Sequence, residues 1–416
     1  MRRRKYMVRY LALGAAVVIL FGCGGNDGRV PASEGTEEER QEQEQTKAEN
    51  GEAQSAEGRD YDLPVDEAQK TEAREACTGM FELAAKVCPE LLQEDPILSD
   101  EVAEAVVEAM GTSDVPVSGP DIYRGMENCE IMEAFLKGCE DGESGEITAY
   151  ELFEDGRIGQ KKFLFDRKEM YLFAVSSYWN GESAVLGDVS YSKVKSWSYS
   201  EKGWLFYELC APEYPEVTEP VYSRAMVRVK PLEEECAEIT EQYLKPIAYN
   251  GNNLFWTDWD ETHMEKLDYN GLFEYLYEVR CDDAFDQTRY AEGIPQEEFE
   301  EMMTSCLPVS REELREYAAY DSEKEMYEWI SLGVGNRTLG AIVSSIPEVT
   351  AIEKNGDGTM TLTVDAVCES MADDALFTHN LTVRTDEEGN VRYFSNAAEE
   401  GARGEELPEY VYRIQR

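Results

Sequence analysis

Histidine is almost absent from this chain of 416 residues, occurring only as His263 and His379. Metal sites built on several imidazoles are therefore excluded. Basic residues are also scarce, with 39 Lys and Arg against 87 Asp and Glu, so the formal net charge is −48. Because nucleic-acid binding needs clustered Lys and Arg to neutralise phosphates, we expect no nucleic-acid partner.

The apolar run near the N-terminus is too short to span a membrane. Its 11 residues, Leu11–Phe21, would cover about 16 Å of a ~30 Å hydrocarbon layer. Basic residues precede this run, and Leu20-Phe21-Gly22-Cys23 resembles a bacterial lipobox, in which the cysteine thiol receives a diacylglycerol before cleavage. We therefore predict a lipoprotein signal peptide over residues 1–22, cleavage between Gly22 and Cys23, and a lipid anchor on Cys23. The alternative is an ordinary secretory signal with a chance cysteine.

The segment after the signal is poor in residues that build a core. Residues 24–60 contain no aromatic side chain and one large apolar residue, Val30. Such a composition cannot bury enough surface to offset the entropy of ordering, so residues 23–61 are predicted to form a disordered acidic tether. Anchored through Cys23, the protein would lie on the extracytoplasmic face of the cell membrane.

The remainder shows two successions of helix-type and strand-type patterns. Residues 62–230 begin with helical periodicity, including helix starts at Ser99 and Asn128 and a helix end at Gly138, and continue as an antiparallel meander. Residues 231–400 repeat this order, and residues 401–416 are expected to form a C-terminal tail. Helices segregated from strands predict an α+β fold with two units.

The strand regions carry hairpin signals and one clear alternation. Asp155-Gly156, Asn180-Gly181 and Glu201-Lys202-Gly203 have the turn chemistry of hairpins. In the second unit, apolar and polar residues alternate from Thr359 to Ala366, which predicts one buried and one solvated face.

Two aromatic clusters are candidates for ligand contact. Strand alternation places Tyr191, Trp197 and Tyr199 on one face, and Trp256 and Trp259 lie beside acidic residues. Flat rings next to hydrogen-bonding groups suit a cell-envelope glycan or peptide, so Trp197, Trp256 and Trp259 are our candidate ligand-binding aromatics. The alternative is that the rings fill the core of a sheet.

Two further patterns have structural interpretations. His379 shares a strand face with Phe377 and Leu381, which favours a hydrogen-bonded core histidine. Residues 353–358 resemble the start of a calcium loop, but the twelfth position is Val364 instead of a bidentate glutamate, so a hairpin turn is favoured. We expect no metal site and no cofactor.

Cysteine spacing leaves the disulfide pattern open. Cys23 accounts for one of 10 cysteines, so at least one of the other nine is unpaired. Cys77 and Cys88, like Cys129 and Cys139, lie roughly 15–16.5 Å apart along a helix, too far to bridge. Cys77–Cys139 and Cys88–Cys129 could align across a helical hairpin, but buried reduced cysteines are favoured.

Three groups of segments carry a family resemblance: Tyr199-Ser200-Glu201-Lys202-Gly203-Trp204-Leu205-Phe206; Tyr243-Leu244-Lys245-Pro246-Ile247 with Asn253-Leu254-Phe255 and Asp258-Trp259; and Asn355-Gly356-Asp357-Gly358-Thr359 with Thr361-Leu362-Thr363-Val364. They resemble an uncharacterised lipoprotein family of anaerobic Gram-positive bacteria over roughly residues 65–396. The resemblance implies an exported, lipid-anchored protein and supplies no catalytic residue.

These observations favour a non-catalytic extracytoplasmic membrane lipoprotein, a binding or accessory module of the cell envelope whose ligand the sequence does not identify. The first alternative is a lipid-anchored envelope hydrolase using paired carboxylates. With about one residue in five acidic, however, such pairs arise by chance. The second alternative, a solute-binding lipoprotein of an importer, would show alternating βαβ units, which this chain lacks.

Overall fold

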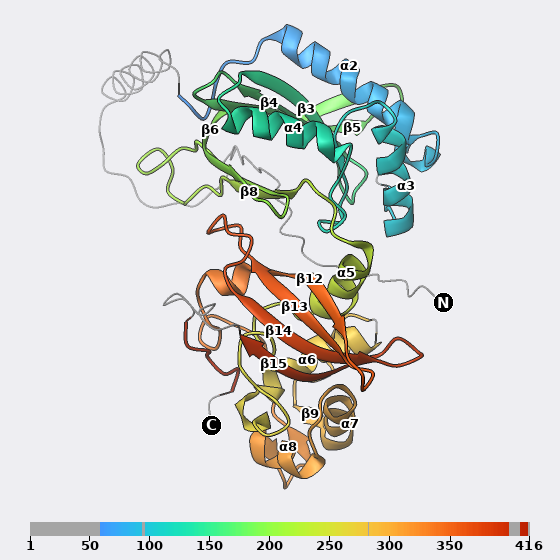
Figure 1. The fold of residues 1–416 in the computed structure, drawn as a ribbon, viewed down its shortest axis with the longest axis vertical. Helices are drawn as coiled ribbons and strands as arrows, with labels where there is room; N and C mark the ends of the chain where they lie inside the picture. The colour runs from blue at the N-terminus through green and yellow to red at the C-terminus, as the bar shows by residue number, and fades with distance from the viewer. Residues whose placement is uncertain (1–58, 94–95, 282, 399–407, 415–416) are drawn as a thin grey trace, which may run out of the picture.

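The fold is α+β, as the sequence predicts, and two units follow each other along the chain (Figure 1). The computed structural model describes residues 59–93, 96–281, 283–398 and 408–414. Within these ranges, no helix has both the length and the apolar character needed to cross a membrane. The predicted signal peptide, its cleavage site at Gly22 and Cys23, and residues 24–58 of the predicted tether lie outside them.

The first unit is built around an eight-stranded sheet with the order β2-β1-β3-β4-β5-β6-β7-β8. Neighbouring strands are antiparallel except β1 and β3, which are parallel. The three predicted hairpin turns join β3 to β4, β5 to β6, and β6 to β7. The elements are α2 (Glu67–Ala84), η1 (Pro89–Leu92), α3 (Asp100–Gly111), β1 (Val117–Ser118), β2 (Met126–Glu127), α4 (Cys129–Glu140), β3 (Gly145–Leu152), β4 (Ile158–Phe165), β5 (Met170–Trp179), β6 (Ala184–Tyr199), β7 (Trp204–Leu209) and β8 (Arg224–Arg228).

Two helix starts predicted from the sequence are confirmed, and one helix end is wrong. Ser99 precedes α3 and Asn128 precedes α4. The Asn128 side chain makes no capping bond, because its amide donates instead to the carbonyls of Gly111 and Val115, each at 2.8 Å. Gly138 lies within α4, which continues to Glu140.

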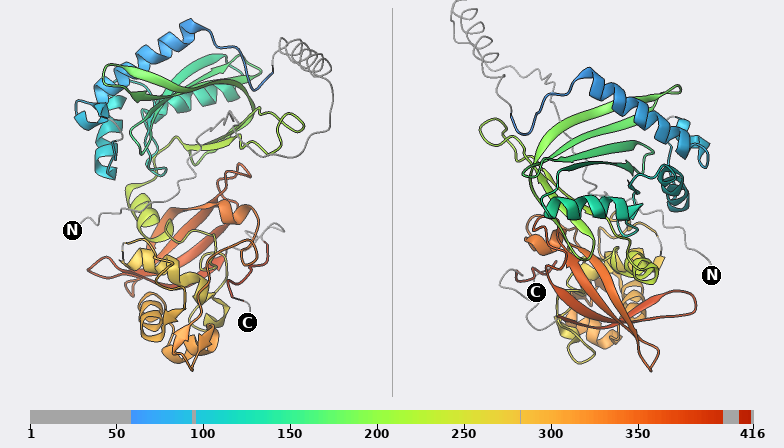
Figure 2. Two further views of the ribbon diagram at one scale, coloured as in Figure 1. Left: turned by 180° about the vertical axis from the view of Figure 1, so that it is seen from behind. Right: turned by 45° about the horizontal axis from the view of Figure 1, so that its top comes forward.

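Helices cover both faces of the large sheet, α2 and α3 one face and α4 the other (Figure 2). The α2–α3 side buries Phe81, Val106, Leu152, Ile158 and Val175, among others. The α4 side buries a second group that includes Met132, Leu136, Phe163, Leu172 and Leu205. Two separate apolar cores therefore pack against the same sheet, one on each face.

A β-bulge in β6 corrects the predicted aromatic face. The pairing of β6 with β7 skips Lys195, and one extra residue inverts the side to which later side chains point. As a result, Tyr191 packs against the core on the α2–α3 side, whereas Trp197 and Tyr199 pack against the core on the α4 side. The prediction that all three rings share a face is wrong.

The second unit combines helices with a four-stranded antiparallel sheet, β12-β13-β14-β15, and a small sheet, β10-β11-β9. Its elements are α5 (Glu234–Ile239), the π-helix η2 (Thr240–Leu244), η3 (Met264–Lys266), α6 (Tyr269–Cys281), β9 (Ile294–Pro295), α7 (Gln296–Cys306), α8 (Arg311–Tyr317), β10 (Tyr320–Asp321), β11 (Met326–Tyr327), η4 (Ala341–Ser344), β12 (Ile346–Lys354), β13 (Met360–Val367), β14 (Thr378–Thr385) and β15 (Val391–Ala398).

The alternation predicted for β13 is mostly confirmed. Leu362, Val364 and Ala366 are fully buried in the core of the second unit. Asp365 lies on the other face and is expected to be solvated, yet it is only 3% exposed. The first unit covers this end of the strand, since the Lys202 ammonium lies 2.8 Å from the Asp365 carboxylate.

Both ends of the described body extend past the predicted boundaries. In the predicted tether, the Asp60 carbonyl accepts a hydrogen bond from the Lys193 backbone of β6 at 2.7 Å. In the predicted C-terminal tail, the Tyr410 hydroxyl donates to Asp268 at 2.8 Å, and Arg413, 1% exposed, donates to Glu274 at 2.6 Å. Residues 59–61 and 408–413 therefore belong to the folded body.

Direct contacts join the two units (Figure 1). Trp204 and Phe206 of β7 form a small apolar core with Val367 of β13. Tyr123, fully buried, donates a hydrogen bond to the carbonyl of Pro347 at 2.6 Å. We call this region the junction.

Candidate functional site

The two tryptophans predicted in the second unit are core residues. Trp256 and Trp259 are 6% and 2% exposed, and their indole N–H groups donate to the carbonyls of Asn252 and Leu254 at 2.7 and 2.8 Å. Trp259 also forms a backbone bridge with Asn396 of β15. Neither ring offers a face to a ligand, so this part of the binding prediction is wrong: the rings complete the core.

Trp197 lies in the first unit, apart from the other two. It is half-buried and packs edge-on against Phe165, with ring centroids 6.3 Å apart. The structure therefore does not bring the three predicted aromatics together.

His379 is a hydrogen-bonded core histidine, as predicted. It is fully buried, with Nδ1 2.6 Å from Asn396 Oδ1 and Nε2 3.1 Å from the Tyr249 hydroxyl. The Asn396 amide group donates to two backbone carbonyls, so its oxygen must accept, which assigns the proton to His379 Nδ1. Burial lowers the pKa of His379 to about 4, so the ring is neutral at physiological pH.

The remaining sequence patterns are also structural. Residues 355–359 form the hairpin turn between β12 and β13, in which Asp357 accepts from the backbone and hydroxyl of Thr359. Within the described ranges, no group of three or more His, Cys, Asp or Glu side chains is arranged to hold a metal ion. The favoured interpretation of the cysteines is confirmed, since all nine in the described part of the chain are free thiols. Six of these nine are buried.

A buried ion pair lies at the junction. Glu348 of β12 is fully buried and accepts hydrogen bonds from the Arg228 guanidinium and from the Trp204 indole, the latter at 2.9 Å. The Arg228 guanidinium also lies 5.2 Å from the centre of the Trp204 ring. Burial raises the pKa of Glu348, and the two donors oppose that shift. This ion pair connects the units, and both of its side chains are buried away from solvent.

A carboxyl pair lies at the same junction. Glu241 in η2 forms a hydrogen bond with Asp121, from the loop between β1 and β2. Burial, followed by the Asp121 contact, raises the pKa of Glu241 to about 9. Glycoside hydrolases hold their two carboxyl groups about 5–9.5 Å apart, whereas these two are in direct contact. The geometry does not favour the paired-carboxylate hydrolase.

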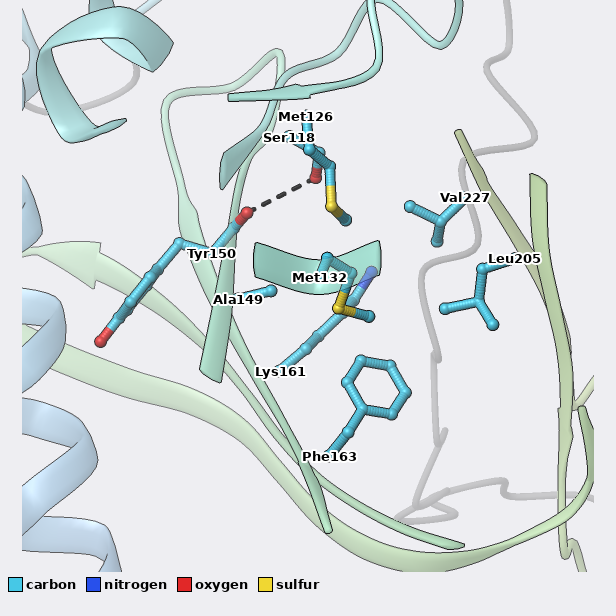
Figure 3. Close-up of a pocket in the computed structure, with 9 residues that line it drawn as sticks. All are labelled: Ser118, Met126, Met132, Ala149, Tyr150, Lys161, Phe163, Leu205 and Val227. Carbon is cyan, nitrogen blue, oxygen red and sulfur yellow. Dashed lines mark hydrogen bonds between the residues drawn. The ribbon is translucent and has the colours of Figure 1, made fainter. Parts of the chain in front are cut away.

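An internal cavity of the first unit is too small for a ligand (Figure 3). It lies between the sheet and α4, has a volume of about 10 Å³, and is lined by residues such as Met132, Lys161 and Phe163. That space suffices for roughly one water molecule. Lys161, whose ammonium group pairs with Glu151 at 2.7 Å, therefore has a structural role.

A larger groove lies on the surface of the first unit, where the described chain begins. It has a volume of about 740 Å³, which is within the usual range for ligand sites of ~300–1,000 Å³. One wall consists of Asp60 and Tyr61, and the opposite wall is the long loop between β7 and β8. The Tyr61 hydroxyl bonds to Glu216 of that loop, and Arg59 pairs with the same carboxylate at 3.8 Å. We call this feature the β7–β8 groove.

Apolar surface and carboxylates line the β7–β8 groove together. Its apolar part includes Leu209, Ala211, Pro212, Tyr214, Val217, Pro220 and Val221. Its charged part is Asp60, Glu208, Glu213 and Glu219 with one cation, Lys195. Tyr214 is 86% exposed, and such a ring is a ready surface for ligand contact.

Sequence reasoning missed this groove, although a signal was present. The strand pattern ends at Cys210, and 14 residues separate β7 from β8, counting 210 to 223. Pro212, Pro215 and Pro220 interrupt that stretch. Hairpin loops usually contain two to five residues, and a much longer ordered loop is often functional.

Comparison with known proteins gives one match. A family model described as "Family of unknown function (DUF6070)" matches residues 66–413, which is most of the chain. Neither the curated proteins nor the solved structures contain a match. The matched range begins at the N-cap of α2 and ends at Arg413, so it includes both units and the C-terminal segment.

Proposed function

We propose that this chain, which belongs to a family of unknown function, DUF6070, is a non-catalytic lipoprotein of the cell envelope. It is anchored through Cys23 on the extracytoplasmic face of the membrane. It binds its ligand in the β7–β8 groove. The lipid anchor and the relation to lipoproteins of anaerobic Gram-positive bacteria rest on the lipobox and on the sequence resemblance. The ligand is a peptide or glycan of the envelope.

The proposal that the protein binds a ligand rests on the β7–β8 groove. It combines a volume of about 740 Å³ with an exposed tyrosine and several carboxylates. A ligand site needs this mixture of apolar area and a few polar groups. Other candidate positions in the described body are occupied: Trp256 and Trp259 by core packing, and Glu348 and Asp365 at the junction by Arg228 and Lys202.

The position of the groove agrees with an anchored protein. Asp60, in its wall, lies at the end of the predicted tether, so the groove would lie at the membrane-proximal end of the body. A flexible coil of 35 residues, Gly24 to Gly58, would span about 30–36 Å. Diacylglycerol supplies two acyl chains, which is what stable anchoring requires.

The anchor is tested by acylation at Cys23. Cells fed an alkyne-bearing fatty acid should label the wild-type protein and leave Cys23→Ala unlabelled. Brief trypsin treatment of wall-stripped cells should release a large soluble fragment, because Arg29, Arg40 and Lys47 precede the body. Label that persists in Cys23→Ala, or failure of trypsin to release the body, would contradict the anchor.

A further inference from the structure

We infer that the β7–β8 groove recognises basic side chains of an extended peptide. This inference rests on the proposed binding function of the groove and adds the chemical class of its ligand. Its basis is the charge of the lining, the exposed ring of Tyr214 and the open backbone of the loop.

The charge of the lining favours a cationic ligand. Four carboxylates face one ammonium group, and that ammonium, Lys195, is already paired with Glu208 at 2.8 Å. Arg224 also lies 3.3 Å from Glu208. Glu213 and Glu219 are exposed and form no ion pair with any residue in the described ranges. These two acids are free to attract a cation.

The cationic ligand carries organic cations, and its charged groups are spaced along the groove. The lining acids do not form a cluster that could hold a metal ion within the described part of the chain. Apolar residues separate them, and the stems of Lys and Arg are apolar while their heads are charged. Tyr214, 86% exposed, offers its ring face to an ammonium or guanidinium group.

The loop backbone favours a peptide ligand. Between residues 211 and 222, the described chain forms one backbone hydrogen bond, from Glu216 N–H to the Glu213 carbonyl. The other carbonyls of this stretch, and its N–H groups apart from the three prolines, form no backbone hydrogen bond and are available to an extended segment. Main-chain hydrogen bonds would then supply affinity, and carboxylates at intervals would select basic side chains.

The test uses fluorescence anisotropy of labelled octapeptides in which alanine alternates with lysine, glutamine or glutamate. The full chain carrying Cys23→Ala serves as the parent protein, at about 0.15 M salt, where distant exposed charges are screened. Glu213→Gln/Glu219→Gln removes two groove carboxylates. Glu323→Gln/Glu387→Gln removes two exposed carboxylates outside the groove and is the matched control. Val217→Trp fills the groove without a change in charge.

The lysine peptide should bind most tightly and lose roughly fivefold in affinity with Glu213→Gln/Glu219→Gln, since each exposed ion pair contributes at most ~1 kcal/mol. The control pair should change affinity less than twofold, and Val217→Trp should abolish binding.

Equal losses in the two double variants would overturn the inference, because binding would then be to the acidic surface in general. If the glutamine peptide binds as well as the lysine peptide and Val217→Trp blocks both, the cationic class is wrong while the groove remains a binding site. If Val217→Trp affects no peptide, the groove itself is wrong.

Discussion

Glu241 of the second unit contacts Asp121 of the first at the junction, and burial together with this contact raises the pKa of the Glu241 carboxyl to about 9. Asp121 is fixed in place, because it accepts from the Tyr123 backbone at 3.0 Å and from Arg124 at 3.1 Å. The charges that face Glu241 are therefore Asp121, which favours the protonated form, and Lys245 and Arg124, which oppose it. The pKa of Glu241 therefore depends on the contact between the units.

Stability should fall as the pH rises through the neutral range. The pKa of Glu241 is raised from 4.5 to about 9 in the folded chain. The folded state therefore keeps a proton that the unfolded state releases between these values, and the free energy of unfolding decreases with pH across that window. The slope is at most ~1.4 kcal/mol per pH unit, reduced by solvent screening. Glu241→Gln should flatten the profile measured by urea denaturation, whereas Glu323→Gln should leave it unchanged. An identical slope in wild type and Glu241→Gln would refute the raised pKa of Glu241.

Removing one member of the buried pair of Arg228 and Glu348 should destabilise the protein more than removing both charges. Arg228→Ala leaves the Glu348 carboxylate buried beside Trp204 without its cation, so it should destabilise the protein by about 3–5 kcal/mol. Arg228→Met/Glu348→Gln removes both charges and keeps an acceptor for the Trp204 indole, so it should lose much less. Chemical denaturation of the two variants measures the difference. A double variant at least as unstable as Arg228→Ala would show that the pair itself contributes the stability.

His379 should not titrate in the folded protein above pH 5. Its pKa is lowered from 6.5 to about 4 by burial. The unfolded chain binds a proton at His379 between these values and the folded chain does not, so this group lowers stability as the pH falls through that window. In NMR spectra with labelled histidine, the ring resonances of His379 should stay constant between about pH 5 and 8. A titration midpoint near 6.5 would contradict the buried site.

Thiol counting should find no disulfide in the described body. Nine cysteines other than Cys23 are free, and Cys281 is the exposed one among them. Denatured Cys23→Ala protein should therefore give nine thiols with and without reductant. In the native state, Cys281 should react first with a thiol reagent, and Cys281→Ser should remove this fast phase. Fewer thiols before reduction would indicate a bridge.

Local patterns predicted much of this fold. Turn residues such as Asp155-Gly156 and Asn180-Gly181 fix hairpins through nearby backbone geometry, and alternation in β13 reports which face is buried. His379 was assigned to the core in the same way. These features depend on a few consecutive residues, so one sequence is sufficient to predict them.

Features that depend on distant contacts were not predictable. The bulge at Lys195 is a single skipped residue, yet it moves Trp197 to the opposite face from Tyr191. Asp365 is buried because β13 meets the first unit, which the alternation of its own strand does not encode. The β7–β8 groove exists because residues 59–61 return to a distant loop.

Hydrogen exchange of the full chain tests the binding site most directly. Amide exchange would be compared for the Cys23→Ala protein alone and with soluble peptide and glycan fragments prepared from the cell envelope, with Val217→Trp as control. The account predicts slower exchange in residues 209–223 and 60–63 when fragments are present, and no such change in Val217→Trp. Protection confined to another region, or equal protection in Val217→Trp, would contradict the assignment of the β7–β8 groove as the ligand site.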